Sequence, residues 1–381
     1  MLQKFKNYTE DQKIVALMIL NLFVPFYGQL VIMVLFTAYL LFKRNLMDCI
    51  KKQPGAKFLY IWAILEIFVA LFYKNYLGAG NALGYVCVGA FLAYYMRHHD
   101  EAFFHDMVDM MLHLSIWIAI IGLIEFWYFS SLKGYSFFEF KVQNSPKRRI
   151  TGTFFNANYY AMMIEFFVGM CLYRWVQVKS VWSKTKYVLI GLLNIFLLYL
   201  TGCRAAFIPL GIVVPLFFIL YGEKKWIFVS LGLMACAGLL FFIKPNLIPR
   251  LSDLSTISSR VKIWKGGIEG IKMYPFFGNG PMTYGNLYEK FGWHKAPHCH
   301  NIYLDALSAY GIVGCIPLFG YIFYLIKGVW STRKNKALFA LMISFIVIYL
   351  VHGLVDCTLN YLSTSCTFLM VLCTVKRQEN T

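Results

Sequence analysis

The dominant pattern in this sequence is a series of long apolar runs separated by short polar segments. Each run has about 15–20 residues, the length that an α-helix needs to cross the hydrocarbon layer of a membrane. The first run, residues 14–42, is too long for one helix and contains the sequence VPFYGQ, so we divide it into a helical hairpin. The later runs cover residues 58–73, 79–96, 111–129, 159–176, 186–202, 205–221, 226–243, 302–327, 337–353 and 360–375. The pattern predicts an all-α, polytopic transmembrane helical bundle of about 12 spans.

The longest polar interval divides the predicted bundle into two unequal parts. Residues 1–243 form an N-terminal membrane scaffold of about nine transmembrane helices. Residues 244–301 form a large extracytoplasmic loop that contains short amphipathic helices. Residues 302–381 form the C-terminal transmembrane helices and a cytoplasmic tail.

The composition is typical of a membrane protein, and in such a protein a strongly basic chain does not by itself indicate nucleic-acid binding. Only 14% of the 381 residues are charged, whereas a soluble domain averages about 25%. The formal net charge of +18 would suggest nucleic acid in a soluble protein. In a membrane protein, basic residues hold the cytoplasmic loops at the inner face, so we expect no nucleic-acid partner. The charged start is not followed by a cleavage site of small residues, so we expect no removable signal peptide.

The distribution of lysine and arginine sets the expected orientation. An even number of spans puts both termini on one side, and the basic-loop rule makes that side cytoplasmic. Two long outer loops break the rule, because they carry cations on the disfavoured side. These cations are Lys147, Arg148 and Arg149 in residues 130–158, and Arg250, Arg260, Lys262, Lys265, Lys272, Lys290 and Lys295 in residues 244–301. An anionic ligand would explain them.

The segment PHCHNIYLDALSAYGIVG, residues 297–314, is the strongest candidate for chemistry. Pro297 favours a helix start, so we expect His300 in the first turn of the following span. Free N–H groups at that helix end would favour an anion, and His300 would be a suitable general base. Gly311 and Gly314, one turn apart, would allow close helix packing. The alternative is an interfacial histidine with a purely structural role.

Four motifs in order resemble the O-antigen ligase and O-antigen polymerase superfamily of bacterial envelope glycosyltransferases. The clearest is His300–Asn301, nine residues, and then G-x-x-G at Gly311 and Gly314. The others are GTFFNANYYA at residues 152–161, LTGCRAAF at 200–207 and SRVKIWKGGIEGIKMYPFFGNGP at 259–281. Each motif alone is weak, but their order and their shared outer side make the resemblance specific over about residues 150–360.

The resemblance implies a membrane glycosyltransferase that moves a glycan from an undecaprenyl-diphosphate donor to an acceptor hydroxyl on the extracytoplasmic face. His300 would be the catalytic base in a catalytic loop at residues 244–301, and Arg204 and Arg260 would bind the diphosphate. The acceptor would be a growing glycan or a lipid A core, as in polysaccharide, capsule or lipopolysaccharide assembly. The implied location is the bacterial inner membrane, in contact with its lipids and with the active site facing outward. No cofactor is expected, and we infer an inverting reaction.

The arginines also have simpler explanations. Arg204 could anchor a span end at lipid headgroups. Arg260 could belong to a plain interfacial helix, because Val261, Trp264, Ile268 and Ile271 recur at helical spacing, with Ser258 or Ser259 as its cap and Pro275 at its end.

Six further polar residues are candidates for contact with substrate or for support of the site: His298, Asn301, Asn156, Asn158, His352 and Asp356. Asn156 and Asn158 could instead cap a helix. His352 and Asp356 are four residues apart, so one helix face would carry both, and they could simply bond to each other.

We expect no metal. Zinc at His298 and His300 would need further ligands, for which only His294, His352 and Asp356 lie on the correct side. A D-x-D carboxylate pair for a nucleotide-sugar donor is also missing from the sequence.

The rival function is a non-enzymatic transporter or flippase for the same lipid-linked oligosaccharide. A transporter should carry charged residues in the middle of its spans, and only Glu66, Glu125 and Glu165 are acidic residues well inside the runs. A binding protein with a peptide-sensing outer loop is a second alternative. The charged cluster outside the spans favours catalysis at the surface.

Overall fold

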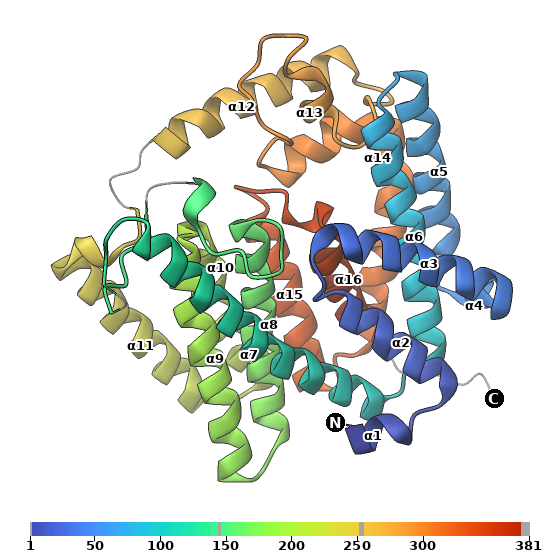
Figure 1. The fold of residues 1–381 in the computed structure, drawn as a ribbon. Coiled ribbons are helices and arrows are strands. Elements are labelled where there is room, and N and C mark those ends of the chain that lie inside the picture. The colour runs from blue at the N-terminus through green and yellow to red at the C-terminus, as the bar shows by residue number, and fades with distance from the viewer. Residues whose placement is uncertain (1, 137, 144–145, 251–254, 375–381) are drawn as a thin grey trace.

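The computed structural model describes residues 2–136, 138–143, 146–250 and 255–374, and these segments contain helices but no β-strand (Figure 1). The helices are α1 (Leu2–Lys6), α2 (Glu10–Asn21), α3 (Phe26–Lys43), α4 (Leu46–Lys52), α5 (Ala56–Phe72), α6 (Tyr76–His98), α7 (Glu101–Ser131), η1 (Pro146–Arg148), α8 (Ala157–Gln177), α9 (Val181–Thr201), η2 (Arg204–Ala206), α10 (Phe207–Tyr221), α11 (Lys224–Ile243), η3 (Pro245–Leu247), α12 (Ser255–Met273), α13 (Thr283–Leu287), α14 (Ile302–Ser331), α15 (Lys336–His352), η4 (Thr358–Asn360) and α16 (Leu362–Leu372). The all-α prediction is confirmed for the described residues.

Fewer helices are long and apolar enough to cross a membrane than the sequence predicts. Among the described residues, 7 helices are long and apolar enough to cross a membrane: α3, α6, α7, α9, α10 with its preceding turn, α11 and α14. An eighth span results if α4 and α5, bent by 112° relative to each other, form one broken span. Every apolar run identified in the sequence overlaps a helix, but α15 and α16 are short. The count of about 12 crossings stays a prediction.

The main hydrophobic core surrounds α8, which packs against α7, α9, α10, α15 and α16. Its apolar residues from Tyr160 to Met170 are buried on every side of the helix, as expected for a helix that is apolar all round. Phe166 stacks on Phe345 of α15 with 4.3 Å between ring centroids. Because α8 is fixed in the centre, its first turn holds Asn158 in a defined place at one end of the bundle.

A smaller core joins α5, α6 and α14. It contains Leu59, Trp62, Ala309, Tyr310, Cys315 and Tyr321. Trp62 stacks on Tyr85 of α6 at 4.5 Å, and the hydroxyl groups of Tyr85 and Tyr310 lie 2.9 Å apart. These three helices therefore form a packed unit beside the main core.

Helices α12 and α13 form a cap over one end of the bundle (Figure 1). Their own core contains Ile263, Tyr284, Ala296 and Cys299, and α12 packs against α14. The cap is anchored where α14 is broken at Gly311, whose φ of 57° and ψ of −169° are not helical. The N–H groups of Ile312 and Val313 donate to the carbonyls of Pro275 (3.0 Å) and Phe276 (2.8 Å) instead of to their own helix. The cap backbone thus replaces the helix hydrogen bonds that the break removes.

The two glycines of the G-x-x-G motif have different structural uses. Close packing was expected for both. Gly314 faces the side chain of Glu66 on α5, and a Cβ at Gly314 would collide with it. Gly311 instead supplies a backbone conformation that almost only glycine adopts, and a Cβ there would lie 2.5 Å from the Gly278 amide nitrogen.

Gly311→Ala should destabilise the protein by about 2 kcal/mol or more, because it combines backbone strain of about 1–3 kcal/mol with a backbone collision. The measurement is the melting temperature of the detergent-solubilised protein. Gly84→Ala in α6 is the matched control, since a Cβ at that position meets nothing within 4 Å. Equal melting temperatures for Gly311→Ala and the parent protein would contradict the proposed anchoring of the cap.

Candidate active site

His300 lies immediately before α14, and its backbone is strained. Asn301 is the N-cap residue, whose side chain accepts hydrogen bonds from the N–H groups of Tyr303 and Leu304, both at 3.0 Å. The prediction that His300 lies in the first helical turn is therefore wrong, because α14 begins at Ile302. The prediction of free N–H groups beside it is also wrong for two of these groups, because they donate to the Asn301 side chain. His300 has a φ of 47°, which costs about 1–3 kcal/mol for a residue other than glycine. Such strain is common at functional sites.

Contacts on both sides of the histidine hold this conformation. Asp305 accepts hydrogen bonds from the N–H of Cys299 (3.0 Å) and from the side chain of Asn360 (3.1 Å). Trp264 of α12 donates to the His300 carbonyl at 3.3 Å. Asn301 donates to the carbonyl of Leu354 at 3.0 Å, which ties the histidine loop to the turn after α15.

The side chain of His300 is hydrogen-bonded to Asp356, which follows α15. The distance from His300 Nδ1 to Asp356 Oδ1 is 3.0 Å. The same carboxylate accepts from the N–H of Cys357 (2.8 Å) and from the side-chain amide of Asn158. Asp356 is only 2% exposed. Burial opposes its ionisation, but the charges of His300, His298 and His352 and the His300 hydrogen bond outweigh burial and hold the pKa of Asp356 well below its usual value.

His298 completes a compact group with these two residues. It is buried, its Nε2 lies 3.8 Å from Asp356 Oδ1, and its ring centroid is 4.4 Å from that of His300. Burial, and then the charge of His300, lower the pKa of His298. The charge of Arg260 contributes in the same direction to the lowered pKa of His298. His298 is therefore neutral at pH 7.

One atom of each residue in this group lies within 4.8 Å of the others, a spacing that could suit a metal ion. The group includes Asp356, one of the extra ligands considered from the sequence, but neither His294 nor His352. The hydrogen bonds do not favour an ion. His298 Nδ1 accepts from the N–H of His300 at 3.2 Å, so the neutral ring carries its proton on Nε2, the atom that faces Asp356. His298 Nδ1 is thus occupied by a hydrogen bond, whereas Nε2 lies 3.8 Å from Asp356 Oδ1.

Three arginines gather at the turn between α9 and α10, at the same end of the bundle. Arg204 donates to the carbonyl of Arg250 at 2.7 Å. Arg149 donates to the carbonyl of Thr201 (2.6 Å) and to Asn158 Oδ1 (2.8 Å). A Cβ on Gly202 would lie 3.2 Å from Arg250 Cδ and 3.7 Å from Arg149 Nε, so this turn brings the arginines together.

Of the remaining candidates from the sequence, Asn156 and His352 support the elements around Asp356, whereas Asn158 contacts Asp356 directly. Asn156 is the N-cap of α8, and its side chain accepts from the N–H of Asn158 at 2.8 Å. His352 and Asp356 do not pair through their side chains, so that alternative is wrong. His352 is fully buried against Glu165 of α8, with Nδ1 3.0 Å from Oε1. It lies behind Asp356, whose N–H donates to the His352 carbonyl at 3.1 Å.

The amphipathic segment forms α12. The helix already includes Ser255, so Ser258 and Ser259 lie inside it and are not its cap. Val261 and Ile268 are 43% and 44% exposed, while Ile263, Gly266 and Gly267 face inward. Glycines form this face because Trp293 packs so closely that a Cβ at Gly266 would lie 3.0 Å from its ring.

From the sequence, Arg149 and Arg250 are predicted only to be cations of the two long outer loops. Their excess charge on the outer side was the available signal, but nothing in the chain indicated that Arg149 contacts Asn158. Among the described residues, no hydrogen bond joins Arg204 or Arg260 directly to His300. Trp264, one helical turn after Arg260 in α12, donates to the His300 carbonyl. Arg204 donates to the Arg250 carbonyl at the turn where Arg149 contacts Asn158.

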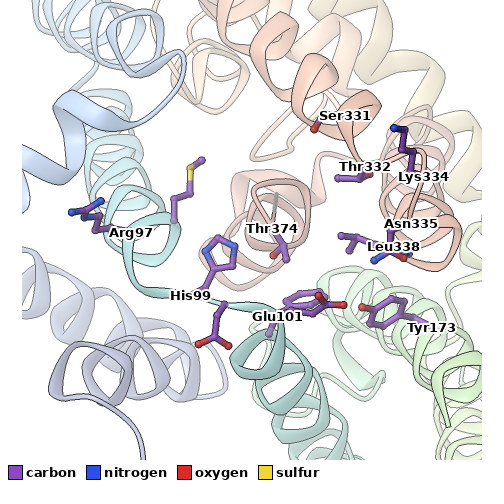
Figure 2. A pocket seen from close by; sticks show the side chains of 13 residues that line it. Arg97, His99, Glu101, Tyr173, Ser331, Thr332, Lys334, Asn335, Leu338 and Thr374 are labelled. Atoms are coloured by element: carbon purple, nitrogen blue, oxygen red, sulfur yellow. Dashed lines mark hydrogen bonds between the residues drawn. The ribbon is translucent and has the colours of Figure 1, made fainter. Parts of the chain in front are cut away.

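A separate cavity lies at the opposite end of the bundle (Figure 2). It has a volume of about 770 Å³ and lies between the α6–α7 turn, the α14–α15 turn and the end of α16. Arg97, His99, Glu101, Tyr173, Lys334 and Thr374 are among its lining residues. Because α14 runs from the histidine loop to this cavity, the cavity does not belong to the candidate site.

Comparison with protein families gives one finding for this chain. Residues 187–319 match the O-antigen ligase family. The matched region includes Arg204, Arg260 and His300, and it ends before Asp356. No curated protein matches the chain. The family match confirms the resemblance to the O-antigen ligase and polymerase superfamily.

Asp356→Asn should lower the melting temperature by a similar amount at every pH between about 5 and 8. The low pKa of the native carboxyl gives stability that is fully present above its unfolded pKa of about 3.9, and this stability is lost as pH falls through the native pKa. The difference from the parent protein should therefore shrink below about pH 4. Asp48→Asn, at an exposed ion pair with Lys52, is the control and should have little effect. A difference that appears only above neutral pH would contradict this account.

Proposed function

We propose that this chain, a multi-pass membrane protein whose residues 187–319 match the O-antigen ligase family, transfers a glycan from an undecaprenyl-diphosphate donor to an acceptor hydroxyl. The observation that carries the proposal is His300 held by the buried carboxylate of Asp356. Arg204 and Arg260 supply positive charge for the diphosphate.

His300 is the general base in this proposal. Asp356 accepts the Nδ1–H of the imidazole, which leaves the lone pair on Nε2 to take the proton of the acceptor hydroxyl. The His300 side chain is 24% exposed, whereas Asp356 is shielded. The base can therefore reach a substrate while its partner stays out of water. Asp356 does not touch the substrate; it holds the ring and stabilises the imidazolium that forms.

Arg204 and Arg260 bind the leaving diphosphate. A planar guanidinium matches phosphate oxygens with two parallel hydrogen bonds, and these bonds strengthen as negative charge develops in the transition state. Arg204 approaches from the α9–α10 turn, and Arg260 from the α12 cap. A diphosphate between the two turns would explain cations at an end of the protein where the basic-loop rule disfavours them.

The reaction needs no metal in this mechanism. The guanidinium groups neutralise the leaving group in place of a metal ion. Attack by the activated hydroxyl on the face opposite the diphosphate inverts the anomeric centre. The acceptor is the end of a growing glycan or a lipid A core; in both cases it presents a hydroxyl to the same base.

The histidine end of the bundle faces outward from a bacterial inner membrane in this proposal. The opposite end carries Arg44, Arg333 and Lys334 in its connecting turns, and Lys43, Lys51, Lys52 and Lys336 at the adjoining helix ends. The basic-loop rule assigns that end to the cytoplasm. Both termini then lie in the cytoplasm.

His300→Ala should keep its membrane level and lose at least about 10²-fold in glycan transfer, because a general base contributes about 10²–10⁴-fold. Its melting temperature should fall, because the buried Asp356 carboxylate loses one of its donors. The assay uses lipid-linked glycan purified from a strain deleted for this protein, with that strain's membranes as acceptor. His294→Ala is the matched control, since that side chain is exposed in the same loop. A transporter or binding protein would tolerate His300→Ala, so retained activity would refute the proposal.

Transfer should proceed at an unchanged rate after treatment with EDTA, and the product should have the opposite anomeric configuration to the donor. Both results follow from direct attack by a hydroxyl on a sugar diphosphate that arginines neutralise. The rate is followed by consumption of the lipid-linked donor, and the anomers by NMR. Loss of activity with EDTA and recovery with zinc would contradict the metal-independent mechanism, while retention of configuration would contradict direct displacement.

A further inference from the structure

A continuous row of four side chains runs from the α9–α10 turn to the candidate base. Arg149 donates to Asn158 Oδ1 at 2.8 Å, and the side-chain amide of Asn158 donates to Asp356 Oδ2. Asp356 Oδ1 then lies 3.0 Å from His300 Nδ1. The row joins segments up to 198 residues apart in the sequence. The sequence did not assign Arg149 to the site.

The charges along this row allow only one orientation of the Asn158 amide. Its oxygen faces a cation and its NH₂ group faces an anion. A rotated amide would place the oxygen against the carboxylate of Asp356 and the NH₂ group against the guanidinium of Arg149, so both contacts would become repulsive. A buried hydrogen bond that is lost at a charged group costs more than one between neutral groups. The cation therefore decides which group Asn158 presents to Asp356.

Asp356 is in turn fixed by donors on both oxygens. Asn158 holds Oδ2, while the N–H of Cys357 and the imidazole of His300 share Oδ1. If Asn158 released Oδ2, the carboxylate could rotate away from His300. The imidazole would then lose the partner that keeps its proton on Nδ1. The orientation of the His300 imidazole thus depends on Arg149, which acts through Asn158 and Asp356.

Arg149 is well held for this purpose. Its Nε donates to the carbonyl of Thr201 at 2.6 Å, at the end of α9. Gly202 follows, and a Cβ there would lie 3.7 Å from Arg149 Nε. The guanidinium is thus fixed by the backbone of one helix end while it points a second donor at Asn158.

We propose that Arg149 is a positioning residue for the transfer reaction, which acts through Asn158 and Asp356 to hold His300 as a base with its lone pair on Nε2. The inference rests on the function proposed above. It gives Arg149 a task distinct from that of Arg204 and Arg260, which contact the donor. Loss of Arg149 slows the chemical step and leaves donor binding intact.

The test is the steady-state kinetics of Arg149→Met with the purified lipid-linked glycan as donor. We expect kcat to fall about 10²-fold, the typical cost of a misplaced catalytic group, with donor KM within about twofold of the parent value. Arg149→Lys should recover part of kcat, because an ammonium still faces Asn158 Oδ1. Lys147→Met, at an exposed position in the same loop, should match the parent protein.

A double-mutant cycle shows whether the row acts as a unit. Arg149→Met and Asn158→Ala together should be no slower than the slower single variant, because each breaks the same path. Effects that multiply would overturn the inference. So would an unchanged kcat, or a raised donor KM with normal kcat, which would make Arg149 a donor-binding residue.

Two further variants keep the outcome interpretable. If Arg149→Met does not fold, as judged by its melting temperature, Asn158→Asp tests the same link, because two acceptor oxygens then face Asp356; a normal kcat for this variant would overturn the inference. His300→Ala separates the two proposals. If His300→Ala retains transfer, the proposed function fails; if it abolishes transfer while Arg149 and Asn158 variants retain a normal kcat, only the inference fails.

Discussion

The hydrogen bond between the buried carboxylate of Asp356 and His300 is the interaction on which the candidate site depends. A carboxylate removed from water loses several kcal/mol of solvation unless donors replace it. Here the donors come from separate places: His300 before α14, Asn158 at the start of α8, and the Cys357 backbone in the turn after α15. Satisfying one charge therefore fixes three segments relative to one another.

Charged side chains of both signs surround the Asp356 carboxylate. The Glu165–His352 pair lies behind Asp356, and Arg149 approaches from the side through Asn158. Arg204 and Arg250 lie at the neighbouring turn, and Arg260 lies on the cap. Negative charge within the group is buried and paired, whereas the cations are concentrated around it. This distribution supports the proposed binding of a diphosphate beside His300.

The cap gives the site a wall that the membrane helices alone could not provide. It is held by backbone hydrogen bonds at the break in α14, and Trp264 reaches from α12 to the carbonyl of His300. Because the break lies in the same helix that His300 precedes, the cap and the candidate base are fixed to one element. The cap therefore holds α12, the helix that carries Arg260, against the His300 loop.

The sequence by itself determined the helical class and the position of the apolar helices, and it named His300, His298, Asp356 and Asn158 among its candidate residues. Apolar runs specify membrane helices because an unpaired backbone is costly in lipid, whatever the rest of the chain does. The order of the motifs pointed to His300, Arg204 and Arg260. Tertiary structure alone decided that His300 pairs with Asp356, that Arg149 orients Asn158, that Gly311 breaks α14 and that glycines form the inner face of α12. Periodicity reports only local conformation, whereas these contacts join residues that are distant in the chain and are selected by how complete helices pack.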